Sequence, residues 1–266
     1  MNTKGKKCVL VVSIVLLCAM FFTGHAFAWG PERTTYTNES PAPYAVFNSI
    51  TDNVVIGDER NFVRMREADS DEKFRDEVEV EPGKEYEVFI YFHNNATTNT
   101  NETGYGVATG TRVASTYPVM LNPGDQGLVS GFIYWNYVTP EDPENAIDGK
   151  VWDEAYITTK TPNLSLRYKA GTAVIHNSGE ANGSILPTNL FSEEGAYIGY
   201  NKLTGIIPGC SEYSGYITYI LVAEAGEPNL VVPIVIALLV FSLVACGLCY
   251  WRKKRNQNRH EDEQSA

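Results

Sequence analysis

One run of aromatic side chains is the clearest place for ligand chemistry in this sequence. Residues 132–137 read Phe-Ile-Tyr-Trp-Asn-Tyr. Successive side chains of a strand point to opposite faces, so Phe132 and Tyr134 would share one face. Trp135 and Tyr137 would share the other. One face can fill a core, whereas an uncovered face can stack on sugar rings or anchor a protein. We therefore take Tyr134, Trp135 and Tyr137 as candidate ligand contacts, with a strand packed beneath a loop as the alternative.

Clusters of acidic side chains are a second candidate, because Ca²⁺ binds converging carboxylate oxygens. They fall within 69–72, 141–148 and 153–154. None has the Asp-x-Asp-x-Asp-Gly spacing of a calcium loop, so we interpret them as solvated charge, with a Ca²⁺ site as the alternative. We predict no metal and no cofactor.

Enzyme chemistry has little support in the sequence. Between the two terminal apolar segments the chain holds two histidines, His93 and His176, each expected at a strand end. It has no Gly-x-Ser-x-Gly turn for a nucleophile and no His/Cys spacing for zinc. Nothing singles out a pair of carboxylates for glycoside hydrolysis. We predict a protein that is not an enzyme, and keep an envelope hydrolase as a remote alternative.

The first apolar segment is typical of a secretory signal peptide. Three lysines lie within residues 4–7, residues 8–22 are apolar, and Ala26-Phe27-Ala28 is a small-x-small cleavage site. These three features in this order predict a leader over residues 1–28, cut after Ala28. An uncleaved signal anchor is the alternative.

The second apolar segment, residues 230–251, is predicted to span a membrane. No charge interrupts its 22 residues, which as a helix would measure about 33 Å against a hydrocarbon core of about 30 Å. Tyr250 and Trp251 suit the interface, and four basic residues follow at 252–255. Basic residues mark the cytoplasmic side, so the tail 252–266 is expected inside and residues 29–229 outside.

Charge and cysteine content constrain the partners and the compartment. Of 21 Lys and Arg and 32 Asp and Glu, the leader and tail hold 8 and 3, which leaves 13 cations and 29 acids, a net charge of −16. This charge disfavours nucleic acid as a ligand. Only Cys210 of the five cysteines lies in the exported part, so no internal disulfide can form there. That absence favours a bacterial surface protein; Cys210 is expected to be unpaired, with a cross-link between copies as the alternative.

Short apolar runs between turn signals predict an all-β domain. Residues 84–93 alternate cleanly, and Phe89 and Tyr91 make the second face apolar too, as in a central strand beneath a covering loop. The Asn- and Thr-rich stretch 94–103 is expected to be an exposed loop, since nothing in it can be buried. No sustained helical period occurs before the membrane segment. We predict an extended segment over 29–43 and an antiparallel β-sandwich over 44–227.

Several short motifs recur along the predicted domain, at 82–95, 113–118, 166–177, 206–210 and 214–219. Together they resemble the conserved repeat domain, an immunoglobulin-like module of bacterial and archaeal surface proteins. In that family the pattern is a strand ending in Asn, a strand leading to Pro, a Gly-Ser-Ala-type strand, and a Leu-x-Pro-Gly turn before the last strand. The resemblance implies an immunoglobulin-like sandwich with a structural or adhesive role.

Two further features qualify this resemblance. Residues 124–162 are a long insertion relative to the module, and the chain has one copy rather than a tandem array. The segments 29–33 and 47–53 are similar to single-span surface proteins of reduced-genome bacteria.

The sequence thus predicts a single-pass cell-surface protein. Its exported domain would meet a protein or glycan partner without catalysis, and its partners would include the membrane but no nucleic acid. The alternative is a carbohydrate-binding module of the cell envelope that uses Trp135 and Tyr137.

Overall fold

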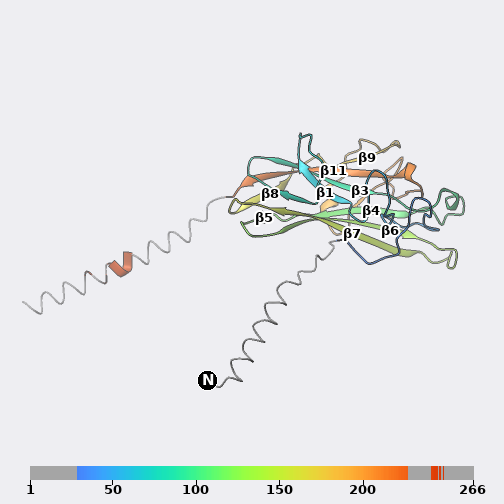
Figure 1. The fold of residues 1–266 in the computed structure, drawn as a ribbon, viewed down its shortest axis with the longest axis horizontal. Helices are drawn as coiled ribbons and strands as arrows, with labels where there is room; N and C mark the ends of the chain where they lie inside the picture. The colour runs from blue at the N-terminus through green and yellow to red at the C-terminus, as the bar shows by residue number, and fades with distance from the viewer. Residues whose placement is uncertain (1–28, 227–240, 245, 247, 249–266) are drawn as a thin grey trace, which may run out of the picture.

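A computed structural model describes residues 29–226, together with 241–244, 246 and 248. Within residues 29–226 the chain forms two facing β-sheets with only short 3-10 turns, so the all-β prediction is confirmed (Figure 1). The strands are β1 Val63–Glu67, β2 Glu77–Glu79, β3 Glu85–Phe92, β4 Thr109–Thr116, β5 Met120–Leu121, β6 Gly127–Tyr137, β7 Ile147–Thr158, β8 Leu164–Tyr168, β9 Val174–Asn177, β10 Ala196–Tyr197 and β11 Gly215–Ala225. The 3-10 turns are η1 Thr98–Thr100, η2 Thr188–Phe191 and η3 Ser211–Tyr213.

The first sheet has the order β1-β3-β11-β8-β5 and is antiparallel throughout. Strand β11 is its centre: β3 pairs along one side, while β9 and β8 follow one another along the other. The alternation in residues 84–93 produces β3, in which Val88, Ile90 and Phe92 are fully buried. Its intervening residues Phe89 and Tyr91 belong to the outer face of the sheet.

The second sheet has the order β10-β4-β6-β7-β2. Strand β2 runs parallel to β7, with Val78 opposite Ile157, so the expectation of a wholly antiparallel sandwich is wrong at this edge. The predicted insertion 124–162 contains β6 and β7, the hairpin at the centre of this sheet. These residues are therefore a main part of the core rather than an addition to it.

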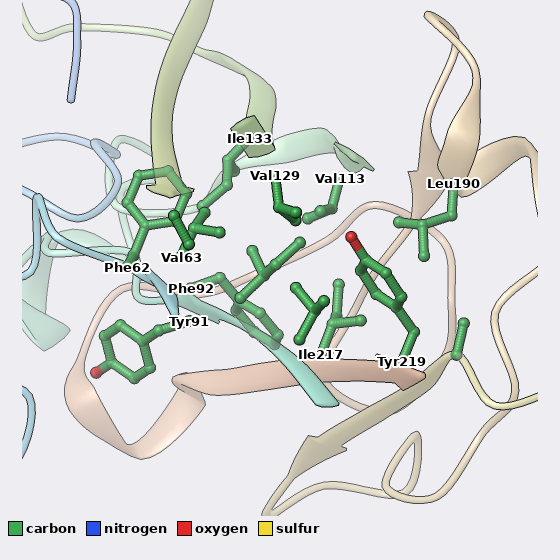
Figure 2. Close-up of a cluster of buried hydrophobic side chains, with 14 of the residues drawn as sticks. Phe62, Val63, Tyr91, Phe92, Val113, Val129, Ile133, Leu190, Ile217 and Tyr219 are labelled. Atoms are coloured by element: carbon green, nitrogen blue, oxygen red, sulfur yellow. The ribbon is translucent and has the colours of Figure 1, made fainter. Parts of the chain in front are cut away.

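The core lies between the two sheets (Figure 2). Phe92 and Ile217 come from the first sheet, and Val113 and Ile133 come from the second; all four are fully buried. Each such side chain stabilises the fold by roughly 1.5–3 kcal/mol. The hydroxyl of Tyr219, a polar tip within this cluster, is satisfied by Ser115 Oγ at 2.7 Å across the sheets. The hydroxyl of Tyr91, the other tyrosine labelled in the cluster, points away from Tyr219.

The N-terminal segment 29–43 packs against the sandwich. Gly30 exchanges two backbone hydrogen bonds with Trp152 on β7, at 2.9 and 2.8 Å. Arg33 donates to Ser49 Oγ at 2.9 Å and to the carbonyl of Asn48 at 2.7 Å. Burial, and then the nearby positive charge of Arg60, lower the pKa of Arg33 to about 10. This segment is therefore held by specific contacts and not merely extended.

The prediction that nothing in 94–103 is buried is wrong for its first residues. Asn94 is fully buried and donates from Nδ2 to the carbonyls of Gly106 and Ile207, at 2.8 and 2.9 Å. Asn95 is also buried, and its Oδ1 accepts from the backbone N–H of Ser49. An amide that satisfies otherwise unpaired backbone groups can be buried without penalty, which composition alone does not reveal.

The predicted signal peptide 1–28 lies outside the described residues, and so does most of the predicted membrane segment 230–251. The described residues of that segment, 241–244, 246 and 248, are helical. Among described residues, no helix is both long and apolar enough to cross a membrane. The tail 252–266 also lies outside the described part.

Candidate functional site

Trp135, predicted as a ligand contact, faces the core. Its side chain is 4% exposed, and its indole N–H donates to the carbonyl of Ala45 at 3.1 Å. The ring also packs on Phe47, with centroids 5.1 Å apart. A ring enclosed in this way is not available to stack on a sugar. The carbohydrate hypothesis therefore loses its central residue, because this face of β6 is the one that fills the interior.

Tyr137 shares the face of Trp135 but lies near the end of β6, where it is half-buried. Tyr44 from the N-terminal part stacks on it, with centroids 5.4 Å apart and planes inclined by 13°. Burial raises the pKa of the Tyr137 hydroxyl, and Tyr44 adds to that rise. One face of this ring is thus already occupied.

Tyr134 lies on the opposite, outer face of the second sheet, and its ligand contact remains a prediction. The ring is half-buried and stacks beside Phe132, with centroids 6.4 Å apart. The guanidinium of Arg112 lies 4.8 Å from its centroid. The alternation predicted for 132–137 is therefore correct, and the face with Phe132 and Tyr134 is the outer one.

A wide cleft in the described part of the chain lies on the outer face of the other sheet. It is a cleft of about 1180 Å³ over β3, β9 and β11, and the loop 53–57 forms one wall. Its lining includes side chains from the segment before β2 and from η3. Ligand sites in proteins are usually concave and largely apolar, which makes this cleft the principal candidate site.

Four rings in contact form a continuous row along the floor of the cleft, which we call the aromatic ladder: Phe74, Phe89, Tyr216 and His176. Successive centroids lie 5.0, 4.9 and 4.7 Å apart. Strand register produces the order, because Tyr216 on β11 is opposite His176 on β9 and diagonal to Phe89 on β3. Burial lowers the pKa of His176, so its ring is neutral near pH 7.

An ion pair closes one end of the aromatic ladder. Arg66 on β1 is opposite Glu87 on β3, and their side chains meet at 2.6 Å. The guanidinium of Arg66 also lies 4.3 Å from the centroid of Phe74. Both charges are half-buried and matched, so this end of the cleft is polar without carrying net charge.

The loop 53–57 presents two valines beside the ladder. Val54 is 94% exposed and Val55 is 84% exposed. Asn53 holds the loop: it exchanges backbone hydrogen bonds with Gly57, and its Oδ1 accepts from the N–H groups of Val55 and Ile56 at 2.9 and 3.1 Å. These hydrogen bonds hold the loop in a conformation that leaves the side chains of Val54 and Val55 exposed to water.

Most polar side chains around the cleft are already engaged inside the domain. Asn177 donates to the carbonyls of Gly199 and Tyr200, and its own oxygen accepts from the Gly179 N–H. Ser178 donates to the carbonyl of Glu212. These groups shape the rim, and they leave the cleft with mainly apolar contacts to offer.

A buried polar network supports the loop from below. Glu59 is fully buried; its carboxylate lies 2.7 Å from Nδ1 of His93 and accepts from Asn53 and Asn95 at 2.6 and 2.7 Å. Burial, and then the charge of Glu59, raise the pKa of the adjacent Tyr91 hydroxyl. A carboxylate–histidine pair can serve as a general base, but His93 is 2% exposed, so the pair here positions the loop.

Sequence reasoning did not identify the cleft. The one usable signal was the apolar second face of residues 84–93, which predicted a strand beneath a covering loop. Tyr91 is indeed buried and lies within 3.4 Å of Asn53 in the loop, while Phe89 remains in the cleft. The other lining residues come from segments far apart in the chain, so no local pattern joined them.

The acidic clusters do not converge on a site. No group of three or more His, Cys, Asp or Glu in the described part of the chain is arranged to hold a metal ion. Asp153, interpreted from the sequence as solvated, is in fact 1% exposed, and its carboxylate accepts from the backbone N–H groups of Phe62 and Val63 at 2.5 and 2.6 Å. Cys210 is a free, partly exposed thiol.

Comparison with family models, with curated proteins and with solved structures finds no match to this chain.

Proposed function

We propose that this chain is a single-pass cell-surface protein whose exported immunoglobulin-like sandwich binds an apolar segment of a partner protein in the cleft. The observation that carries the proposal is the pair Val54 and Val55, almost fully exposed beside the aromatic ladder. Contiguous apolar surface of this kind marks interaction sites, because leaving it in water is costly. The role is structural or adhesive rather than enzymatic.

The chemistry of the cleft favours a protein segment over a sugar. Sugar rings bind through open aromatic faces and many hydrogen bonds, but each ring of the ladder contacts its neighbour, with centroids 5.0 Å apart or less. Asn177 and Ser178 have already used their hydrogen bonds within the domain. Leu, Val or Phe side chains of a partner could bury against the ring edges and the two valines, and each would gain roughly 1.5–3 kcal/mol.

The surroundings of the cleft favour a basic partner. The exported part carries a net charge of −16, which would attract a cationic protein surface and repel a second acidic copy. Apolar contact in the cleft would then provide the affinity, while the electrostatic field of the acidic domain would raise the association rate.

The proposed topology rests on the sequence. The leader 1–28 would direct export and the segment 230–251 would anchor the chain, with the basic run 252–255 in the cytoplasm. One span and a short tail suit a protein that presents a domain to the outside.

The test of the cleft measures binding of fluorescent apolar-basic decapeptides to the full chain in detergent micelles. The variant V54S/V55S removes the exposed apolar pair, and V119S is the matched control because Val119 is 72% exposed on a different part of the surface. We expect wild type and V119S to bind alike and V54S/V55S to bind at least about tenfold more weakly, which corresponds to about 1.4 kcal/mol. Equal binding by all three proteins would falsify the proposal.

A further inference from the structure

A second surface lies on the outer face of the β10-β4-β6-β7 part of the other sheet. Strand register aligns Tyr197, Arg112, Tyr134 and Lys150 in one row across four neighbouring strands. We call these four residues the cation–aromatic row. Ring and cation alternate along it, and Tyr197 is 50% exposed. This row is separate from the cleft, which lies on the outer face of the first sheet.

The rings and cations of this surface contact one another closely. Arg112 lies 4.8 Å from the centroid of Tyr134. The ammonium group of Lys150 lies 5.0 Å from the centroid of Phe132, 5.2 Å from Tyr134 and 5.6 Å from Trp152. Phe132 and Trp152 are opposite each other in the next row of the same face. Cation–ring contacts orient the charged groups over apolar surface instead of toward carboxylates.

Within residues 29–226 neither Arg112 nor Lys150 forms an ion pair, although the exported part has 29 acids for 13 cations. By contrast, Lys84, Arg167 and Lys169 all pair with glutamates. Two cations left without a carboxylate in so acidic a domain are available to an external anion.

Acids do border this surface, and their hydrogen bonds are made elsewhere. Asp148 accepts from Asn136, and Glu154 accepts from Ser130 at 3.4 Å. On β7, Asp148 lies two residues before Lys150, and Glu154 lies two residues after Trp152. They confine the positive charge to the centre of the face.

We propose that the cation–aromatic row binds an acidic polysaccharide. Arg112 and Lys150 lie on strands two apart, about 10 Å from one another across the sheet, with Tyr134 between them. Two carboxylates of the polymer pair with the two cations. The sugar between them packs on the outward edge of the Tyr134 ring, because Arg112, Lys150 and Phe132 contact its faces. Tyr197 extends the aromatic surface beyond Arg112. The row thus uses Tyr134, and neither Trp135 nor Tyr137, for the sugar.

A polysaccharide suits this face better than an acidic peptide. Peptides gain affinity from backbone hydrogen bonds at a sheet edge or from side-chain pockets. The row lies on a sheet face, and the cleft does not include it. A sheet face with aromatic rings between charges offers apolar contact to sugar rings and ion pairs to their carboxylates.

The experiment uses the full chain in detergent micelles and three probes: polygalacturonic acid, the same polymer with its carboxylates methyl-esterified, and polyglutamate. The variant R112Q/K150Q removes both charges, and K202Q is the control because Lys202 is an exposed cation outside the row. We expect wild type and K202Q to bind the acidic polymer, with R112Q/K150Q weaker by about tenfold or more, as two charge-assisted hydrogen bonds are lost. Circular dichroism checks that the double variant is folded.

Three results would overturn the proposal. The first is no binding of the acidic polymer, or binding that R112Q/K150Q leaves unchanged. The second is equal binding of the esterified polymer, which would make the cations irrelevant. The third is equal binding of polyglutamate, which would show that charge alone is recognised and would assign the face to acidic protein. V54S/V55S should bind the acidic polymer like wild type, so failure here is distinguishable from failure of the cleft proposal.

Discussion

At the scale of single residues, Asp153 shows how far a local reading of charge can mislead. Its place beside Glu154 suggested a solvated cluster, but strand alternation turns it inward. There its carboxylate accepts hydrogen bonds from two backbone N–H groups. One belongs to Val63, the first residue of β1, and the other to Phe62, the residue before it. The carboxylate thus joins β7 of one sheet to the start of β1 in the other, a role that only the tertiary fold defines.

Replacing Asp153 by Ala should lower the free energy of unfolding by about 3 kcal/mol, because two buried N–H groups lose their acceptor. Urea denaturation followed by fluorescence measures the change. Glu154→Ala is the control, since Glu154 is half-buried and makes one long hydrogen bond. Similar losses in both variants would contradict this role for Asp153.

The pH dependence of stability should carry the signature of the same residue. Burial raises the pKa of Asp153 to about 7 despite the amide donors, whereas an unfolded chain has an Asp pKa of about 4. Between these values the folded state binds the extra proton, so the stabilising contribution is full below pH 4 and is lost as the pH rises to 7. The Tm of wild type should therefore fall relative to that of Asp153→Asn over this range, because only wild type has the titrating carboxyl. A difference independent of pH would argue against the raised pKa.

At the scale of elements, the β6–β7 hairpin determines which aromatic face becomes core. Trp135 is opposite Gly149, and its ring lies across that glycine: a Cβ there would sit 2.2 Å from the indole. Glycine at 149 therefore gives the indole room to lie flat between the hairpin and Ala45. The alternation of 132–137 was predictable because it is local. The choice of inner face was not, because it depends on Gly149 and on Ala45, which is distant in sequence.

Gly149→Ala should therefore destabilise the protein by about 1–3 kcal/mol, because the added methyl group displaces the Trp135 ring. Thermal unfolding measures the loss, and tryptophan fluorescence reports whether the indole moves. Asp148→Ala, at the neighbouring exposed position, is the control and should change stability by less than about 0.5 kcal/mol. A variant as stable as wild type would show that the hairpin accommodates the methyl group freely.

The strands themselves were easier to predict than the cleft. Residues 84–93 alternate so cleanly that β3 follows from the period alone. Strand register brings Phe89, Tyr216 and His176 of the aromatic ladder together from distant parts of the sequence. Phe74 joins them from the segment before β2. The loop 53–57 was not identified, since the exposure of two valines is not visible in a short apolar dipeptide.

At the scale of the whole molecule, the proposed topology makes the sandwich accessible on intact cells. Protease treatment of such cells should release a fragment of approximately 200 residues that ends between residue 226 and the segment 230–251. Mass spectrometry of the supernatant measures it, and lysed cells are the control. A fragment protected until lysis would place the domain inside and would remove both binding proposals.

The position of β11 has a mechanical consequence. This last strand leads out of the domain at residue 226 and is bonded along both sides, to β3 and to β9 and β8. Its ladder bonds are perpendicular to its axis. A pulling force on the C-terminal end of β11 therefore loads many backbone hydrogen bonds in shear at the same time, so the strand resists being pulled out of the sheet.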